Sequence, residues 1–382
     1  PERLGMGDAV SIMVGIVVGT AIFRSPPLVF QNVPNAWLGM GLWVLGGGLS
    51  LVGALCYAEL ATTYPRAGGD YEYLNRAFGR WMGFLFGWTQ LTVILTGSIG
   101  SMGYAFADYA ARLWQLPHYT TVWLAAGAIL LLTLANLLGV VVGKTAQNLL
   151  SAAKILGLLA VVAAGLLAPR PENVVVQPLA TTPSIGLAMV FVLYAYGGWN
   201  DTAFVAAEVR NRRRNLPLAL FLGISAITLI YLLINGAYLL ALGFEGARQS
   251  WTPASDVAAR AVGEWGARAI SVLVMVSALG AINGLILTGS RIYASLGADH
   301  KPFAWLGYWH HRIGAPVGAL IAQAAVSLLL VFAVGTAWGR GTIDAALSLV
   351  RLAGLPWEEY FGGFETLVAG TAPVFWGFFL LT

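Results

Sequence analysis

Two charged residues stand inside stretches of sequence that are otherwise apolar. Lys154 lies within the apolar stretch 145–168, and Asp201 closely follows a glycine pair, Gly197 and Gly198. Ionisable groups are costly in such surroundings, so each of them indicates a functional site by default. A buried lysine changes its protonation state readily, whereas a lysine near the end of an apolar helix extends its amine to water. Asp201 either pairs with a cation or caps the helix that resumes after the glycines.

Poor helix formers interrupt two of the apolar stretches. Gly19 and Thr20 fall within the first stretch, and Gly197 and Gly198 fall within the sixth. Opened backbone inside a membrane must line a cavity or be buried in protein, because lipid cannot satisfy its N–H and C=O groups. Freed N–H groups at a helix N-terminus attract a carboxylate, and freed carbonyls attract an ammonium. The two interruptions therefore favour a site for a small zwitterion.

The sequence offers little material for catalysis or for metal binding. It has one cysteine, Cys56, and four histidines, and it contains neither a Gly-x-Ser-x-Gly nor a His-Glu-x-x-His motif. One cysteine excludes a disulfide framework and a cysteine-based metal site. We therefore expect a protein that is not an enzyme and that has no metal and no cofactor.

The composition of the chain is that of a membrane protein. Of its 382 residues, 58% are hydrophobic and 10% are charged, whereas a soluble domain has about 25% charged residues. A spanning helix needs about 20 mostly apolar residues, and ten stretches qualify. They lie near residues 7–31, 37–63, 81–112, 119–139, 145–168, 184–209, 216–243, 266–297, 315–334 and 364–382. A water-soluble fold is excluded, and the net charge of +4 is no sign of nucleic-acid binding.

Basic residues between the apolar stretches indicate the orientation in the membrane. With the N-terminus inside, twelve lysines and arginines fall in inner loops and eight fall in outer loops. The inner set includes the cluster Arg210–Arg214, which we interpret as a topology signal that contacts anionic lipid. Inner loops carry the excess of positive charge in membrane proteins. We expect a multi-pass protein of the cell membrane with a cytoplasmic N-terminus.

The two interrupted stretches occupy corresponding places in two sets of five. Interrupted segments at matching positions of two halves are the best indication in a sequence of a transporter site. We therefore predict one all-α membrane domain over residues 1–382, with a first repeat near 7–168 and a second near 184–382.

The motifs in these segments resemble those of the amino acid–polyamine–organocation superfamily. The resemblance is closest to the L-type amino acid transporters and their bacterial amino acid exchanger relatives, and it covers nearly the whole chain. It rests, in order and spacing, on Gly19–Phe23, Gly53–Leu60, Gly68–Leu74, Ala195–Asn200, Asn215–Pro217, Asn283–Gly284 and Ser290–Arg291.

The resemblance implies a fold of five plus five helices related by an inverted repeat, with helices 1 and 6 broken. In the family two more helices follow; the present chain accommodates ten spans and leaves no room for helices 11 and 12. The resemblance further implies a secondary transporter that opens its site alternately to the two sides of the membrane. Neutral L-amino acids are the expected substrates, carried by sodium-independent exchange or by proton-linked uptake.

The resemblance also implies which residues hold the substrate. Backbone N–H groups around Thr20 and Ala21 would bind the carboxylate, and carbonyls near Val17, Tyr194 and Gly197 would bind the ammonium. The family usually has glycine where this chain has Ala21, which predicts a somewhat tighter site. The expected substrate-binding residues are Val17, Gly19, Thr20, Ala21, Ile22, Val93, Ser98, Tyr194, Gly197, Gly198 and Asn283.

Four side chains in this set carry more specific expectations. Tyr194 stands where related exchangers often have phenylalanine, and it would close the outer side of the site. Val93 and Ser98 combine an apolar with a small side chain, which suggests a pocket for a neutral substrate side chain. Asn283 would hydrogen-bond between helix 8 and the site.

Lys154 and Asp201 are expected to serve coupling or conformational change. In sodium-independent members of the superfamily, a helix 5 lysine occupies the place where sodium-coupled relatives bind sodium, and it ties helix 5 to the break in helix 1. Lys154 fits that position, so the resemblance argues against sodium coupling. The same lysine is also a candidate for a proton-linked group.

Two other functions remain open on the same fold. Asp201 is the carboxylate best placed to hold a cationic amino acid or a polyamine, and a non-transporting amino acid sensor would share these motifs. The expected partners are an amino acid, membrane lipid and, for a proton-linked carrier, protons, with no nucleic acid. Some animal relatives form a disulfide with a single-span glycoprotein, but Cys56 lies within a predicted span, so no such link is expected.

Overall fold

The computed structural model describes residues 4–64, 68–117, 119–170, 184–250, 252–311, 314–349, 357, 363–379 and 381. Nearly all of them are helical, and one short antiparallel pair of strands joins Trp309–His310 (β1) to Ala315–Pro316 (β2). The helices of the first half are α1 (Met6–Val17), α2 (Ala21–Gln31), α3 (Ala36–Thr63), α4 (Asp70–Phe78), α5 (Arg80–Thr89), η1 (Gln90–Ile94), α6 (Leu95–Trp114), α7 (Thr120–Leu137) and α8 (Val140–Leu167). Those of the second half are α9 (Ile185–Tyr196), η2 (Trp199–Glu208), α10 (Arg212–Gln249), α11 (Pro253–Val262), α12 (Glu264–Asp299), η3 (Lys301–Gly307), α13 (Val317–Gly335), α14 (Ala337–Leu349) and α15 (Gly363–Phe379).

Many of these helices are long and apolar enough to cross a membrane. Among the described residues there are 7 such helices, or up to 8 if the bent pair α1 and α2 forms one span. The chain is therefore a multi-pass membrane protein. The predicted stretch 184–209 is divided between α9 and the 3₁₀-helix η2, and α15 at the last predicted stretch is shorter than a full span. The division into ten spans thus stays a prediction.

The first helix interruption separates α1 from α2. The two helices are bent by 54° relative to each other, and Val18, Gly19 and Thr20 connect them. Glycine and a β-branched threonine both lower helix stability, which explains why the bend falls at this point. The bend opens backbone groups in the middle of the apolar stretch.

The second interruption follows α9. Gly197 is extended, with φ −59° and ψ 152°, and Gly198 has a left-handed backbone with φ 98°. Only glycine adopts this second conformation without strain, so the Gly-Gly pair ends the α-helix here. The chain continues as the tighter helix η2 from Trp199 to Glu208.

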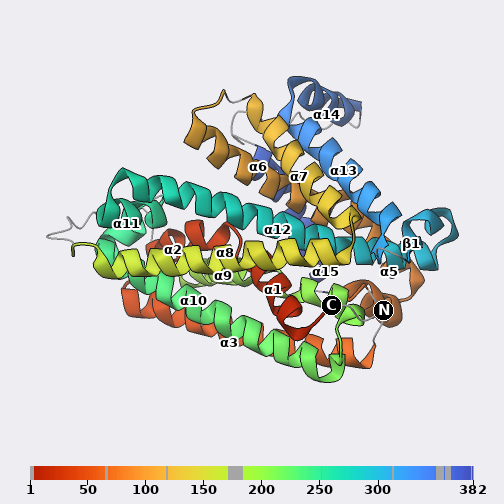
Figure 1. The fold of residues 1–382 in the computed structure, drawn as a ribbon, viewed down its shortest axis with the longest axis horizontal. Coiled ribbons are helices and arrows are strands. Elements are labelled where there is room, and N and C mark those ends of the chain that lie inside the picture. The colour runs from red at the N-terminus through yellow and green to blue at the C-terminus, as the bar shows by residue number, and fades with distance from the viewer. Residues whose placement is uncertain are drawn as a thin grey trace.

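Buried apolar residues form two clusters that divide the molecule. The first cluster joins α1, α2, α3, α8, α9, η2, α10 and α11 with part of α12, and it includes Trp43 and Tyr231. The second joins α6, α7, α13 and the rest of α12, and it includes Ile129 and Leu320. In Figure 1, α3 and α10 lie along one side of the molecule, and α6, α7 and α13 lie along the other. The helix interruptions of α1–α2 and α9–η2 lie between these two sides.

Candidate functional site

A cavity of about 200 Å³ lies where the two helix interruptions meet. Gly19, Thr20 and Ala21 of the first interruption and Gly197 and Gly198 of the second line its wall. The remaining wall residues are Ile16, Val17, Gln90, Ile94, Leu95, Ser98, Ser101, Met102, Tyr194, Asp201, Ala281, Leu285, Val368, Thr371 and Phe375. Because most of these side chains are apolar, polar recognition in the cavity depends on opened backbone and a few polar groups.

The start of α2 offers backbone donors to the cavity. The first N–H groups of a helix have no partner within that helix, and no side chain caps α2 at Thr20. Thr20 is 7% exposed, and it lines the cavity together with Ala21. η2 also begins without a side-chain cap after Gly198. Two uncapped helix N-termini at one cavity suit a small anion such as a carboxylate.

Carbonyls at the ends of α1 and α9 are partly engaged within the protein. The Tyr231 hydroxyl on α10 lies 3.2 Å from Val17 O and 2.8 Å from Ala195 O, so one phenol joins the two interruptions. The Gly19 N–H also donates to Val17 O, at 2.8 Å. A carbonyl oxygen has two lone pairs, so the predicted ammonium contact at Val17 requires one of these bonds to open. Tyr194 O accepts one hydrogen bond, from the Gly197 N–H at 3.1 Å.

Most of the predicted substrate-binding residues line the cavity, but three of them do not. Ile22 is fully buried in the first apolar cluster. Val93 is half-buried and does not belong to the cavity wall. Asn283 is fully buried in a polar network. The predicted pairing of Val93 with Ser98 around a neutral side chain therefore loses one of its two members in this conformation.

Gln90 is a cavity residue that the sequence reasoning missed. It begins η1, a short π-helical turn between α5 and α6, and π-helical turns often mark functional sites. The signal was present in the sequence, since a glutamine within an apolar span is unusual. Thr371 and Phe375 of α15 were also missed, because nothing in their local sequence shows which helix faces the cavity.

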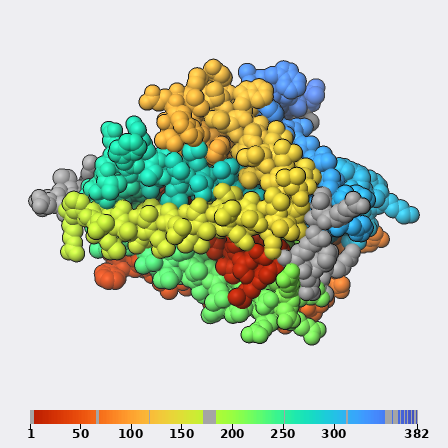
Figure 2. All heavy atoms as spheres, viewed as in Figure 1, coloured from red at the N-terminus to blue at the C-terminus, as the bar shows by residue number. Residues whose placement is uncertain are grey.

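Polar side chains along one face of α8 contact α1 at successive helical turns. We call this set of contacts the α1–α8 ladder. Its members are Lys144 and Asn148, which contact the Asp8 carboxylate, Ser151, which donates to Ser11 O, and Lys154, which donates to Gly15 O, at distances between 2.8 and 2.9 Å. Figure 2 shows α8 crossing the front of the molecule directly beside α1. The ladder fixes the half of the broken helix that precedes the cavity.

Lys154 is the fully buried member of the ladder. Its side chain is 0% exposed, and its Nζ donates to Gly15 O at 2.8 Å. Among the described residues, no carboxylate lies within ion-pair distance of this amine. The lysine therefore binds the backbone of α1 shortly before the interruption.

Asn283 is the centre of a buried amide network behind the cavity. Its Nδ2 donates to Gln147 Oε1 at 2.8 Å and to Gly143 O at 3.0 Å, and its Oδ1 accepts from Asn136 Nδ2 at 2.8 Å. The network joins α7, α8 and α12. Asn283 thus contributes to the framework around the site and makes no direct contact with the cavity.

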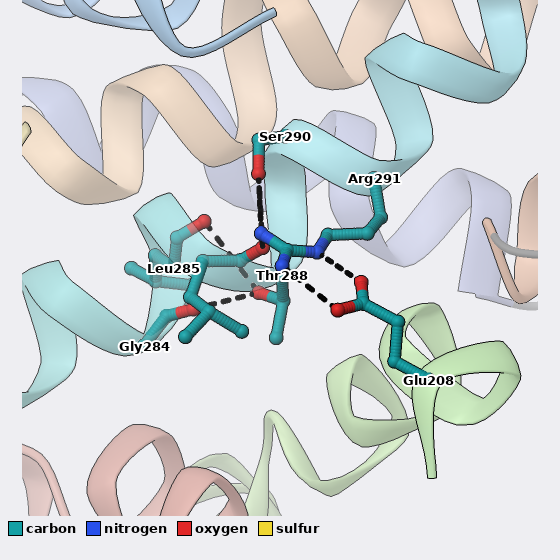
Figure 3. Close-up of polar contacts among 7 residues, drawn as sticks. Glu208, Gly284, Leu285, Thr288, Ser290 and Arg291 are labelled. Atoms are coloured by element: carbon teal, nitrogen blue, oxygen red, sulfur yellow. Dashed lines mark hydrogen bonds and ion pairs between the residues drawn. The ribbon is translucent and has the colours of Figure 1, made fainter. Parts of the chain in front are cut away.

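A buried ion pair ties the end of η2 to α12. Figure 3 shows the Arg291 guanidinium facing the Glu208 carboxylate, with Nε–Oε1 and Nη2–Oε2 distances of 2.6 and 3.2 Å. The same arginine donates to Leu287 O and Ser290 Oγ, so its donors are largely satisfied. Beside this pair, the Leu4 N–H donates to Glu208 O, and Leu4 O accepts from the Arg210 N–H. These bonds hold the segment before α1 against the end of η2.

On the other side of the cavity, two further cavities follow one another. The second shares Thr20 with the central cavity, and the third, of about 590 Å³, shares Phe23, Arg24, Tyr109 and Arg112 with the second. A line of cavities therefore extends from the central cavity along α2. A further cavity of about 350 Å³, beside α3, shares Gly197, Gly198 and Phe375 with the central one.

A buried carboxyl pair lies beside the second interruption. Asp201 of η2 lines the cavity and is close enough to Asp70 of α4 for their charges to interact. Asp70 is 3% exposed, and its Oδ2 accepts from Asn200 Nδ2 at 3.3 Å. Burial raises the pKa of Asp70 to about 7, although hydrogen bonds with Tyr57 and Asn200 oppose the shift. No lysine or arginine lies within ion-pair distance of either carboxyl among the described residues.

Comparison with known sequences identifies the family of this chain. The sequence profile of the amino acid permease family matches residues 4–356. The chain belongs to the amino acid permease family. This permease is therefore an amino acid transporter and not an enzyme, as the sequence motifs predicted.

Individual relatives agree with the family match. The permease is 32% identical over 342 residues to the b(0,+)-type amino acid transporter 1 of Oryctolagus cuniculus, covering 86% of the permease and 70% of the relative. It is 31% identical over 348 residues to the large neutral amino acids transporter small subunit 2 of Homo sapiens, covering 86% and 64%. It is 30% identical to the Asc-type amino acid transporter 1 of Homo sapiens, covering 86% and 65%.

Solved structures agree on the fold. A Na⁺-coupled sialic acid symporter in a substrate-bound outward-open state superimposes with a TM-score of 0.60 at 13% identity, covering 98% of the permease and 90% of the symporter. MHP1, a nucleobase-cation-symport-1 family transporter in a closed conformation with bromovinylhydantoin bound, gives a TM-score of 0.57 at 12% identity, covering 92% and 79%. At such low identity, these similarities show the fold alone.

Proposed function

We propose that the permease carries neutral L-amino acids across the cell membrane, without sodium, by exchange or by proton-linked uptake. The observation that carries the proposal is the cavity at the two helix interruptions. Its wall includes Thr20 and Gly198, where α2 and η2 begin without side-chain caps, and Tyr194, whose carbonyl accepts one hydrogen bond. The substrate carboxylate binds the N–H groups at Thr20 and Ala21, and the ammonium binds carbonyls near Tyr194. Ile94, Leu95 and Met102 give the remaining wall an apolar character that suits a neutral side chain.

Independence from sodium is proposed from Lys154. A fixed ammonium group already donates to Gly15 O at 2.8 Å, beside the first interruption. A second cation near this amine would be repelled and would compete with it for backbone oxygens. Lys154 supplies the positive charge that a bound ion would otherwise bring.

The transport cycle is proposed from the way in which buried apolar residues divide the helices into two groups. The fold is interpreted as five plus five helices in an inverted repeat, in which the element pairs α1–α2 and α9–η2 are the broken helices 1 and 6. These helices, with α3 and α10, rock against α6, α7, α12 and α13. The two apolar clusters support this division in part. The second cluster contains α6, α7 and α13, and the first contains α1, α2, α3, α9 and α10, but α8 and part of α12 also pack in the first. Opening to the cytoplasm then requires release of the α1–α8 ladder.

A second candidate differs in the substrate. Asp201 in the cavity wall favours a cationic amino acid or a polyamine. The names of the relatives do not decide between the two candidate substrates. One relative is named for large neutral amino acids, and the b(0,+)-type amino acid transporter 1 is not.

Transport by the purified protein in liposomes tests the proposal. Uptake of labelled L-leucine and L-alanine is measured with and without internal substrate, sodium and a pH gradient. We expect uptake that replacement of sodium by choline leaves unchanged and that internal leucine or an inward proton gradient increases. Strong dependence on sodium would contradict the role given to Lys154. Substrate binding without any counterflow would instead identify a sensor.

A further inference from the structure

The cavity of about 350 Å³ between α3, the second helix interruption and α15 is separate from the proposed substrate site, and we call it the α3 cavity. It has Gly197, Gly198 and Phe375 in common with the central cavity. The α3 side of its wall consists of Leu49, Ser50, Gly53, Cys56 and Tyr57. Their spacing follows the helical repeat, so these five residues form one stripe along α3.

A lack of side chains leaves this space open beside α3. The helices α3 and α9 touch at Gly46, where an added Cβ would collide with Val192. Nearly two turns further along α3, an added Cβ on Gly53 would lie 2.8 Å from the Trp199 ring. Between these two contacts α9 ends at the glycine pair of the second interruption, which has no side chains to fill the gap. The cavity is therefore a consequence of the interruption itself.

The α3 cavity lies on a surface that faces the membrane. α3 is 28 residues long and apolar enough to span it, and in Figure 1 it lies along the edge of the molecule. Leu45, Leu49, Val52 and Leu55 of α3 are between 48% and 61% exposed, and Cys56 is also exposed. Exposed apolar side chains of a spanning helix contact the hydrocarbon of the bilayer. Lipid chains are therefore the molecules that the α3 cavity meets.

The wall of the α3 cavity suits an apolar occupant. Among the described residues, no charged side chain belongs to it. The Asn200 amide in the wall donates to Asp70 Oδ2 at 3.3 Å, and the Tyr57 ring packs edge-on against Trp199 at 5.1 Å. A zwitterionic amino acid would lose its hydration here without gaining partners for its charges. An empty apolar cavity loses dispersion contacts, which a hydrocarbon chain restores.

We propose that the α3 cavity takes up an acyl chain of a membrane lipid, which packs against the second helix interruption and restrains it. The chain contacts Gly197 and Gly198, the same backbone that lines the central cavity. Movement of η2 relative to α3 changes the shape of the α3 cavity, so the chain must rearrange at each turnover. This restraint rests on the proposed transport function, whereas occupancy by the chain does not.

Photolabelling in vesicles tests how far the chain reaches. The protein is placed in dioleoyl phosphatidylcholine vesicles that contain a small fraction of the same lipid with a diazirine in the middle of one chain. After illumination, mass spectrometry of peptides locates the labelled residues. We expect adducts on Trp199 and Tyr57, which are 7% and 6% exposed and are shielded from lipid at the outer surface. Lipid confined to that surface labels Val52 and Leu55 but neither of the two buried rings.

A matched pair of variants tests the restraint. Cys56→Trp places an indole in the wall of the α3 cavity, and Leu55→Trp places one at an exposed position of α3 outside that wall. We expect Cys56→Trp to lose the adducts on Trp199 and Leu55→Trp to keep them. In proteoliposomes, Cys56→Trp should take up labelled L-leucine about fivefold more slowly than Leu55→Trp, because a plug fixed to α3 cannot leave when η2 moves.

Three results would overturn parts of the proposal that can be told apart. Labelling that stops at the outer surface of α3 would show that no acyl chain enters, as expected if another protein segment or a second copy covers the cavity. Adducts on Trp199 that persist in Cys56→Trp would contradict entry through the α3 cavity. Equal leucine uptake by the two variants, with the expected labelling, would contradict the restraint. A wild-type protein without leucine uptake would contradict the proposed function instead, and the labelling would still decide the lipid site.

Discussion

Lys154 makes one hydrogen bond to the backbone of α1 from a fully buried position. Removing the amine in Lys154→Ala leaves Gly15 O without this donor and frees the end of α1 that precedes the cavity. We expect transport to fall by about tenfold or more, because hydrogen bonds from charged groups contribute about 1.5–3 kcal/mol. Surface expression should fall much less. Uptake normalised to surface protein makes the measurement, and equal losses of both would indicate a purely structural lysine.

Glu208 and Arg291 form the buried ion pair at the end of η2. Removing one partner leaves the other charge buried and uncompensated, which costs about 3–5 kcal/mol. We expect Glu208→Gln and Arg291→Met to lower the thermal midpoint strongly. In the double variant both charges are absent, so much of the loss should be recovered. Thermal unfolding of the four proteins in detergent checks this, and additive losses would show that the pair has no energetic coupling.

Asp70 makes stability depend on pH. Its pKa is about 7 in the folded protein against an ordinary value of 3.8. Between about pH 4 and 7 the folded state holds a proton that the unfolded chain has released, so stability falls as pH rises. The slope is at most about 1.4 kcal/mol per pH unit and vanishes above about pH 7. Unfolding midpoints of the wild type and Asp70→Asn across this range test the expectation, and the variant should show a flatter profile.

Part of the candidate site can be predicted from the types of the residues alone. Gly19, Thr20, Gly197 and Gly198 are predictable because poor helix formers stand out in an apolar stretch, and all four line the cavity. Gln90, a polar residue in an apolar stretch, carries the same kind of signal and also lines the cavity. Val93 shows the limit, since the face that a residue presents within a long helix depends on how neighbouring helices pack around it.

At the scale of elements, the contact between α1 and α8 depends on a glycine. A Cβ on Gly15 would lie 1.7 Å from Gln147 Nε2 and 2.9 Å from Ser151 Oγ, so α8 approaches the bare backbone here. Gly15→Ala should separate the two helices and cost about 1–3 kcal/mol through overpacking. Gly7→Ala on the same helix has no atom within 4 Å of the new Cβ and is the matched control.

Gly7→Ala is expected to be neutral or to stabilise by about 0.5–1 kcal/mol, because alanine favours the helix. Thermal midpoints compare the two variants. A Gly15→Ala protein as stable as Gly7→Ala would show that the α1–α8 contact is looser than its geometry indicates. In Gly15→Ala we also expect faster modification of a cysteine placed in the ladder by a water-soluble thiol reagent.

Element boundaries followed the sequence closely where apolar stretches end at polar residues or glycines. The predicted stretch 37–63 corresponds to α3, Ala36–Thr63, and 266–297 corresponds to α12, Glu264–Asp299. The π-helical turn η1 within the third stretch had no local signal, because its formation depends on packing around Gln90. The 3₁₀ geometry of η2 also had no local signal in the sequence.

At the scale of the whole molecule, the proposed transport cycle requires α1 to separate from α8. Linking α1 to α8 should stop the cycle in the conformation described here without abolishing substrate binding from the side of α2. Cys56 is the single cysteine of the chain, so Cys56→Ser gives a background for introduced pairs. Asp8→Cys with Asn148→Cys replaces two side chains that are 2.8 Å apart in the ladder.

In this double-cysteine variant, a short bifunctional thiol reagent should reduce uptake to background, and reduction of the link should restore it. Substrate binding to the linked protein, measured in detergent, should persist. Each single-cysteine variant treated with the same reagent is the control. Uptake that continues with the link in place would contradict the proposed rocking motion.

The bonds between Leu4 and the segment after η2 have a practical consequence for handling the protein. Because Leu4 accepts from Arg210 and donates to Glu208, backbone hydrogen bonds join the segment before α1 to the end of η2. A bulky fusion attached close to Leu4 would strain these bonds and bias the conformations sampled in a labelling or structural experiment. Affinity tags are better placed on another segment, or separated from Leu4 by a long flexible spacer.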